Sequence, residues 1–231
     1  MKRIMWLVSL VPLFITAIAL CFFPDTVPMH YNAEGMIDRW GSKYENLLFP
    51  VIILGLTMFW QLLIKAYEKK AAKAKTEKER TETLSNAKML HIVAISMATM
   101  YCIMQCFILY GAYIEANVGA THSVVNVAQL SCILLGVMFI VLGSFMPKTK
   151  INGSVGFRIV WSMHNDVTWS KSNHFAGVML IIVGALTIIT AIFLEAMLAT
   201  GLMIVYLFIS VILASIYSYR VYKEQINEKN E

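Results

Sequence analysis

Charged residues are scarce in this chain. They make up 14% of its 231 residues, whereas apolar residues make up 58%. An ordinary soluble domain carries about 25% charged residues, and a soluble core of this size cannot hide so much apolar surface. The charges also fall in blocks between long apolar segments, an arrangement that needs lipid as the solvent. The composition therefore excludes a soluble globular domain.

Cysteines are few, and segments that alternate between apolar and polar residues are absent. The four cysteines all fall within apolar segments, so they predict no disulfide framework. Cys102 and Cys106 stand four residues apart on one helix face. Without further ligands near them we expect packing residues rather than a metal pair. No segment has the period of two that a membrane-spanning β-barrel needs.

Six apolar segments have about the length of a membrane span. About 20 helical residues, rising about 1.5 Å each, cross the ~30 Å hydrocarbon core of a bilayer. We therefore predict an all-α integral membrane protein with about six transmembrane helices. The first segment follows Lys2 and Arg3 but lacks a small-x-small cleavage site, so we expect it to be retained. The predicted spans are 4–23, 47–64, 89–114, 124–145, 175–194 and 198–217.

Lysine and arginine residues mark the cytoplasmic side. Of the 19, all but Arg39 and Lys43 fall in the two termini and in alternate loops. Because cytoplasmic loops carry the excess of Lys and Arg, we predict a multi-pass protein of the cell membrane with both termini in the cytoplasm. The net charge of +5 reflects this topology, and we expect no direct contact with nucleic acid.

The loops divide this single polytopic domain, 1–231, into smaller parts. An N-terminal two-span unit is followed by a charged linker, which is rich in helix-forming Ala, Glu and Lys and is expected to extend the second helix. The linker is either a solvated connector or a docking site for a cytoplasmic protein or anionic lipid. The third and fourth spans, a second loop with the last two spans, and a cytoplasmic tail follow. The boundaries are 1–66, 67–88, 89–145, 146–222 and 223–231.

The external loop 24–46 is predicted to form a small hairpin. Two short extended segments, 27–31 and 36–40, flank a turn sequence that ends in Gly35. Pro28 favours extended backbone before it. The loop has four carboxylates against two cations, a balance that attracts a cationic partner.

His30, Glu34 and Asp38 are residue types that bind a metal or recognise a cationic peptide. The alternative is a loop held together by ion pairs of Asp38 with Arg39 and Lys43. We expect no metal here. The candidate peptide-binding residues are His30, Asn32, Glu34, Gly35, Asp38 and Lys43.

The cytoplasmic loop 146–174 is also expected to be structured. Asn165 has the side chain of a helix N-cap, and Asp166 is favourable in the first turn of that helix. The helix is expected to carry His174 into the fifth span. The tryptophans of this loop suit a membrane interface.

Three roles are open for the polar residues of this loop. Arg158 after a glycine-rich turn is typical of an anion clamp. His164, Asp166 and His174 are, in principle, metallohydrolase ligands, but no H-E-x-x-H or comparable spacing is present. We therefore predict no enzyme, no catalytic residue and no cofactor. The structural alternative is that Arg158 and Asn165 tie the loop under the helices while His174 packs at the mouth of the fifth span.

Few polar residues interrupt the spans, and no run of charges typical of a pump is present. Glu115 and Glu195 stand at outer ends of spans, where we expect water to solvate them. Gln105 is expected to hydrogen-bond between helices. Five glycines are expected to permit close helix contacts, namely Gly136, Gly143, Gly177, Gly184 and Gly201.

Both loops resemble parts of known bacterial membrane proteins. The first is similar to the signature of an uncharacterised N-terminal domain, and the second resembles the signature of the SdpI family, which that domain accompanies. Ile159, His164 and Ser172 depart from the family pattern. The matching positions are Pro24, Pro28, His30, Asn32, Gly35, Asp38, Ser42, Lys43 and Pro50 in the first loop, and Asn152, Gly156, Arg158, Trp161, Asn165, Trp169, His174 and Gly177 in the second.

This resemblance implies an immunity or signalling protein that lies in the lipid bilayer. The best-described member of the family protects a bacterium against its own secreted toxic peptide and holds a transcriptional repressor at the membrane. By resemblance, the first loop faces a peptide outside and the second faces a partner such as a repressor inside. A small-molecule transporter, a membrane sensor of unknown ligand and a membrane enzyme remain as alternatives.

Overall fold

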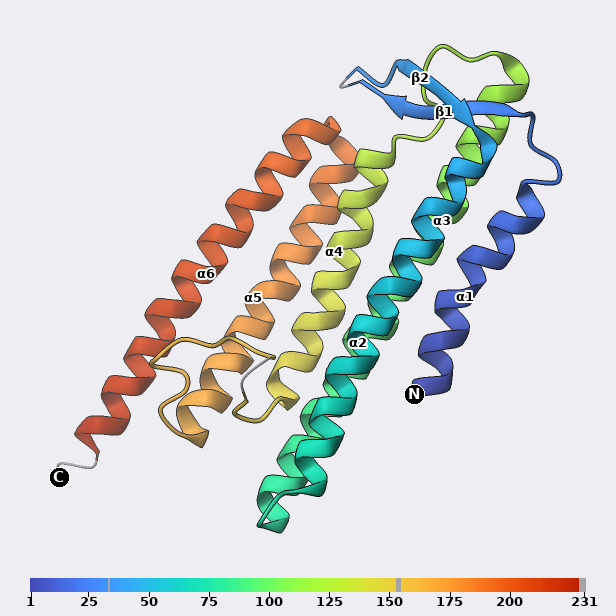
Figure 1. Cartoon of the computed structure of the whole chain (residues 1–231). Helices are drawn as coiled ribbons and strands as arrows, with labels where there is room; N and C mark the ends of the chain where they lie inside the picture. The colour runs from blue at the N-terminus through green and yellow to red at the C-terminus, as the bar shows by residue number, and fades with distance from the viewer. Residues whose placement is uncertain (33, 153–154, 229–231) are drawn as a thin grey trace. The chain divides into compact units, whose positions relative to one another are not determined.

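The structure, a computed structural model, describes residues 1–32, 34–152 and 155–228. Across these residues it contains six helices long and apolar enough to cross a membrane, and one two-stranded hairpin (Figure 1). The predicted fold class, an all-α membrane protein with about six spans, is confirmed. The helices are α1 Lys2–Ala19, α2 Leu48–Ala72, α3 Glu77–Val118, α4 Val127–Phe145, α5 Asp166–Phe193 and α6 Ala196–Asn227.

The chain forms two compact units. The first unit contains residues 1–61 and 94–131, and the second contains residues 62–93 and 132–231. Helices α2 and α3 therefore contribute to both units. The two units are described separately below.

The first unit carries the predicted external hairpin. Strand β1, Thr26–Tyr31, pairs antiparallel with β2, Ile37–Ser42, and a short 3₁₀ helix, Lys43–Leu47, leads into α2. The hairpin crosses the ends of α1, α2 and α3 in this unit (Figure 1). Backbone bonds tie it to the loop after α3, since Ile37 N–H donates to Thr121 O over 2.9 Å. The prediction of two extended segments around a turn is confirmed.

The base of the hairpin is sealed by an apolar cluster. Val27 of β1 is fully buried and packs with Phe23, Leu109 and Ala112. Because successive strand residues point to opposite faces, the burial of Val27 means that one face of β1 packs against the protein. Pro28, on the opposite face, is buried as well, so β1 becomes exposed only farther along, at His30.

The helices of the first unit are also joined by polar contacts. The hydroxyl groups of Ser9 and Thr57 share a 2.7 Å hydrogen bond, and Gln105 Nε2 donates to Thr16 Oγ1 over 2.8 Å. All four side chains are buried. The expected interhelical hydrogen bond of Gln105 is thus confirmed.

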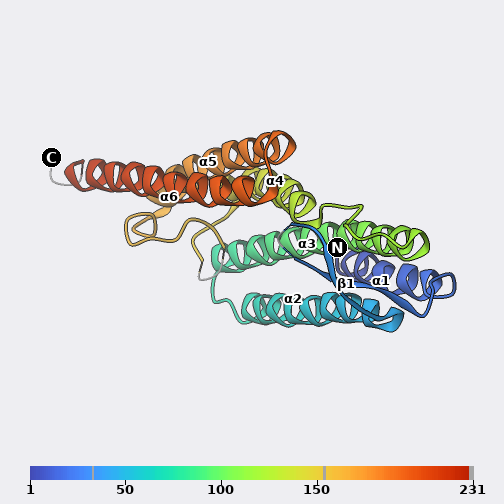
Figure 2. The same ribbon diagram turned by 90° about the horizontal axis from the view of Figure 1, so that it is seen from above.

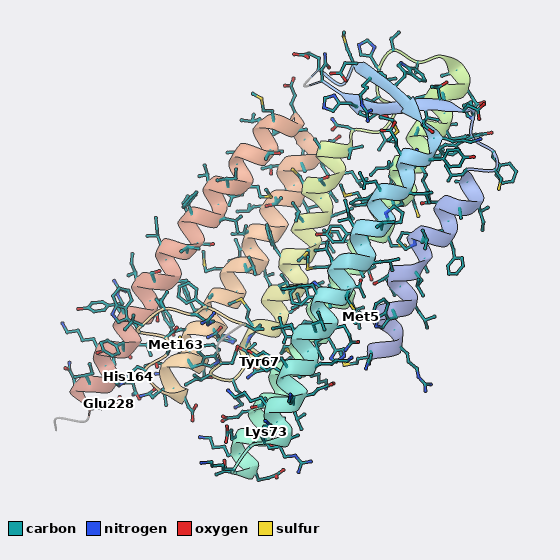
Figure 3. The ribbon with its side chains drawn as sticks, in the orientation of Figure 1. Met5, Tyr67, Lys73, Met163, His164 and Glu228 are labelled. Carbon is teal, nitrogen blue, oxygen red and sulfur yellow. The ribbon has the colours of Figure 1, made fainter. Side chains whose placement is uncertain are left out.

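The charged linker is a helical hairpin rather than one extended helix. Helix α2 ends at Ala72, and α3 begins at Glu77 after a short turn that starts at Lys73, labelled in Figure 3. The predicted extension of the second helix is therefore correct only as far as Ala72. Thr76 explains the new start, because its Oγ1 accepts a 3.1 Å bond from Glu79 N–H, as an N-cap does.

The second unit is built on a close contact between α4 and α5. A Cβ placed on Gly136 would lie 2.8 Å from Gly184 O, and one on Gly143 would lie 2.5 Å from Gly177 O. These four glycines therefore permit close helix contact, as predicted. Gly201 was predicted to do the same, which is wrong, since a Cβ there meets nothing within 4 Å.

Helices α5 and α6 lie side by side along their length (Figures 1 and 2). Inside this pair, the buried hydroxyls of Ser172 and Ser218 are 2.9 Å apart and hydrogen-bonded. The predicted tail, 223–231, begins within α6, which continues to Asn227. Residues 229–231 of that tail lie outside the described part of the chain.

Candidate functional site

The turn of the external hairpin is shaped by Asn32 and Gly35. Asn32 Oδ1 accepts hydrogen bonds from Glu34 N–H at 3.1 Å and Met36 N–H at 2.8 Å. Gly35 has a φ of 77°, in the left-handed region that favours glycine. Of the predicted turn sequence, Ala33 lies outside the described residues. The structure therefore gives Asn32 and Gly35 a part in the shape of the hairpin.

The polar side-chain contacts of the hairpin differ from the predicted ion pairs. His30 Nδ1 lies 2.6 Å from Asp38 Oδ1, and Arg39 lies 2.7 Å from Glu45. The predicted pairing of Asp38 with Arg39 and Lys43 is wrong. Asp38 and Arg39 are consecutive strand residues, so their side chains leave opposite faces.

Lys43 is held inside the hairpin base. Its Nζ donates to Phe23 O over 3.1 Å and lies 3.2 Å from Asp25 Oδ1. Its side chain is only 15% exposed, whereas that of Asp25 is 98% exposed. The ammonium group of Lys43 therefore links the hairpin to the segment that follows α1.

Glu115 of α3 is the unexpected residue of this region. We predicted that water would solvate it near the membrane surface, and this is wrong, because Glu115 is fully buried. Its carboxylate accepts hydrogen bonds from Tyr31 Oη at 2.6 Å and from Val124 N–H at 2.6 Å. The loop after α3 folds back and the hairpin covers it, so protein donors replace water.

This buried carboxylate changes the chemistry of its partner in β1. The pKa of Tyr31 is raised well above its ordinary value, first by burial, then by its hydrogen bond to Glu115 and by the nearby negative charge. Tyr31 therefore stays protonated and keeps donating its hydrogen bond. A sequence signal existed, because a carboxylate at the end of an apolar segment needs partners.

Three of the predicted hairpin residues remain on the surface. His30, Glu34 and Asp38 are exposed, as are the aromatic side chains of Trp40 and Tyr44. The exposed surface of the hairpin thus combines a His–Asp pair, a further carboxylate and two aromatic rings. Carboxylates and aromatic rings both attract cationic groups.

The cytoplasmic signature loop closes around Gly156. This glycine has a φ of 114°, and a Cβ on it would lie 2.6 Å from Asn173 Oδ1 and 2.9 Å from Trp169 Cζ2. Asn173 Oδ1 accepts the N–H of Phe157 at 2.7 Å, and Trp169 Nε1 donates to Thr149 O over 2.9 Å. Only glycine combines this backbone angle with this close approach.

One prediction about this loop is wrong, and one residue was missed. Trp169 was expected at the membrane interface, but it is buried inside the protein with 2% exposure. Asn173, which sequence reasoning missed, is fully buried beside it. Its position four residues after Trp169, on the same helix face, was the available signal.

The start of α5 confirms the predicted N-cap. Asn165 Oδ1 accepts the N–H of Thr168 at 2.8 Å, and Thr168 Oγ1 accepts the N–H of Asn165 at 3.0 Å. This reciprocal pair is a capping box. Asp166 follows in the first turn, where it forms a 3.1 Å ion pair with Lys78 of α3.

In one of the three open roles, Arg158 ties the loop under the helices and His174 packs at the fifth span, but both side chains are exposed. Nearby, the ring of Trp161 stacks edge-on against Tyr219, and that of His164 against Tyr222. Figure 3 shows His164 beside the last turns of α6. Aromatic contacts with α6, and not Arg158, therefore secure this side of the loop.

The other signature residues belong to the scaffold. Asn152 Oδ1 accepts the N–H of Val155 at 2.7 Å, and Gly177 permits the approach of α4. Within the described ranges, no group of three or more His, Cys, Asp or Glu side chains is arranged to hold a metal ion. Among the cationic and histidine candidates of this loop, Arg158, His164 and His174 are exposed.

Comparisons with known proteins match both ends of the chain. Residues 7–54 match the model of a domain of unknown function, DUF1648, and residues 148–218 match that of the SdpI/YfhL protein family. The immunity protein SdpI of Bacillus subtilis (strain 168) is 21% identical over 225 residues, which cover 96% of this chain and 97% of the relative. No solved structure matches. The predicted resemblance to the SdpI family is confirmed, and the protein is a multi-pass membrane protein.

Proposed function

We propose that this protein makes the cell that carries it resistant to a secreted toxic peptide. The similarity to an immunity protein carries the proposal, because it spans 96% of the chain and includes both structured loops. Six helices long enough to span a bilayer fit an immunity protein that acts at the membrane. No catalytic step is needed for this function.

The hairpin is the proposed site of peptide recognition. His30, Glu34 and Asp38 are exposed on it, while Asn32 and Lys43 hold its shape through hydrogen bonds. Because Tyr31 is bonded to the buried Glu115, the hairpin is fixed to α3 before any partner arrives. A rigid, acidic and aromatic surface favours a cationic, partly apolar peptide, since little ordering entropy is lost on binding.

Survival of a sensitive host tests the proposal. Cells that express the chain are titrated with secreted toxic peptides, beside the variants Glu34→Gln and Asp38→Asn at equal membrane levels. Glu195→Gln is the matched control, because it removes an exposed carboxylate that is not part of the hairpin, at the start of α6. We expect wild type and control to protect and the hairpin variants to protect less. Absence of protection by wild type against every peptide would contradict immunity.

We further propose that the signature loop holds a cytoplasmic repressor. The exposure of His164 and His174 beside the buried residues Trp169 and Asn173 supports this assignment. The double variant His164→Ala/His174→Ala should then alter transcription while protection stays intact. Unchanged transcription in this variant and in a deletion strain would contradict it.

A further inference from the structure

An apolar pocket opens in the second unit where the signature loop meets α5 and α6. Its volume is about 170 Å³. Among the described residues that line it, Ser210 is the only one with a polar side chain, and its Oγ donates to Leu207 O over 2.8 Å. This described lining therefore suits an apolar occupant. The other lining residues include Met146, Phe157, Ala176, Leu207 and Ala214.

The depth of the pocket matches the acyl chains of one leaflet. Helix α5 has 28 residues, which span about 42 Å at about 1.5 Å per residue, whereas the hydrocarbon core is ~30 Å thick. When the hydrocarbon core is placed on the apolar, C-terminal part of α5, the first, polar turns of this helix project beyond it. This placement puts Ala176 just inside the core and Leu207 of α6 nearer its middle. By the predicted orientation this is the cytoplasmic leaflet.

Two cationic residues are close in sequence to residues that line this pocket. Arg158 directly follows Phe157, and Lys148 comes two residues after Met146, with its Nζ 4.7 Å from the ring centroid of Phe145. Both side chains are exposed, and neither forms an ion pair with any residue that the structure describes. Their charges are free for an anion at the height of the lipid headgroups.

We propose that this pocket binds one anionic phospholipid of the cytoplasmic leaflet. One acyl chain enters the pocket under Phe157, and the phosphate lies between Arg158 and Lys148. Basic residues between helices on the cytoplasmic side are suited to anionic headgroups. The pocket is smaller than the roughly 300–1,000 Å³ of sites for free ligands, but it admits part of a chain whose remainder stays in the bilayer.

Lipid retention tests this site. Detergent-purified protein is stripped of lipid and titrated with phosphatidylglycerol or phosphatidylcholine, and bound lipid is counted by native mass spectrometry. We expect preference for phosphatidylglycerol, and about fivefold weaker binding in Arg158→Gln and in Lys148→Gln. Lys223→Gln removes an exposed charge at the end of α6 and should bind as wild type does.

A second pair of variants tests the pocket itself. Ser210→Leu fills it, whereas Ser215→Leu makes the same change at a serine of α6 outside the described lining, and each serine hydroxyl donates to a carbonyl of its own helix. We expect Ser210→Leu to abolish the bound lipid and Ser215→Leu to keep it. Equal retention of the two lipids, or unchanged binding in Ser210→Leu, would overturn the proposal. So would a co-purifying polypeptide that occupies the site in place of lipid.

Discussion

Tyr31 of the external hairpin donates a 2.6 Å hydrogen bond to the buried carboxylate of Glu115, which lies 84 residues later in the chain. This bond joins a loop outside the predicted membrane region to a spanning helix. The same carboxylate accepts the N–H of Val124, so it also holds the loop between α3 and α4. One side chain thus organises three segments of the first unit.

Removing the tyrosine hydroxyl should loosen the hairpin. In Tyr31→Phe the buried carboxylate loses one donor, and we expect the free energy of unfolding to fall by about 2 kcal/mol. Hydrogen exchange of residues 24–46 should become faster. Tyr44→Phe is the control, because that ring is 62% exposed. Equal stability and exchange in the two variants would contradict the anchoring role of the bond.

Alkaline pH should destabilise the protein through the same residue. The pKa of Tyr31 is raised in the folded state by burial and by Glu115, so the unfolded chain loses this proton first. The stabilisation is therefore complete below about pH 10, the ordinary tyrosine pKa, and falls as the pH rises above it. Denaturation midpoints measured from neutral to alkaline pH should fall more for wild type than for Tyr31→Phe. Parallel curves would show that Tyr31 does not contribute.

Gly156 should tolerate no side chain. In Gly156→Ala the Cβ would meet Asn173 Oδ1 at 2.6 Å, and alanine would have to adopt a φ of 114°. We expect a loss of about 3 kcal/mol from the two effects together, seen as a lower melting temperature in detergent. Gly55→Ala, with nothing within 4 Å of its Cβ, should melt no lower than wild type, because alanine favours the interior of helix α2. A stable Gly156→Ala variant would mean that the loop can rearrange.

The contact between α4 and α5 should be equally sensitive. Gly143→Ala places a Cβ 2.5 Å from Gly177 O, which forces the helices apart at a cost of about 1–3 kcal/mol. Gly201→Ala makes the same chemical change in open space and should stabilise α6 slightly, by up to about 1 kcal/mol. Thermal melts of the two variants in the same detergent compare them directly. Similar melting temperatures would contradict the packing role of Gly143.

Part of the candidate site could be predicted because its signals are local. The turn at Gly35 and the cap at Asn165 depend on residues within three or four positions, and the structure confirms both. The ion pairs could not be predicted in this way. Charge alone favoured an ion pair between Asp38 and Arg39. In the strand these two side chains point to opposite faces, and Asp38 contacts His30 instead.

The sequence by itself determined that this protein lies in a lipid bilayer, and it determined the main secondary-structure elements. Apolar segments of about 20 residues require a bilayer, and caps, turns and the break near Thr76 follow from the side chains of a few neighbouring residues. The tertiary structure alone decided which residues are buried. Glu115 is buried because a hairpin 84 residues away covers it, and Trp169 because the loop folds over Gly156. The physical reason is that burial depends on packing between segments that are distant in the chain. Local sequence patterns do not predict such packing.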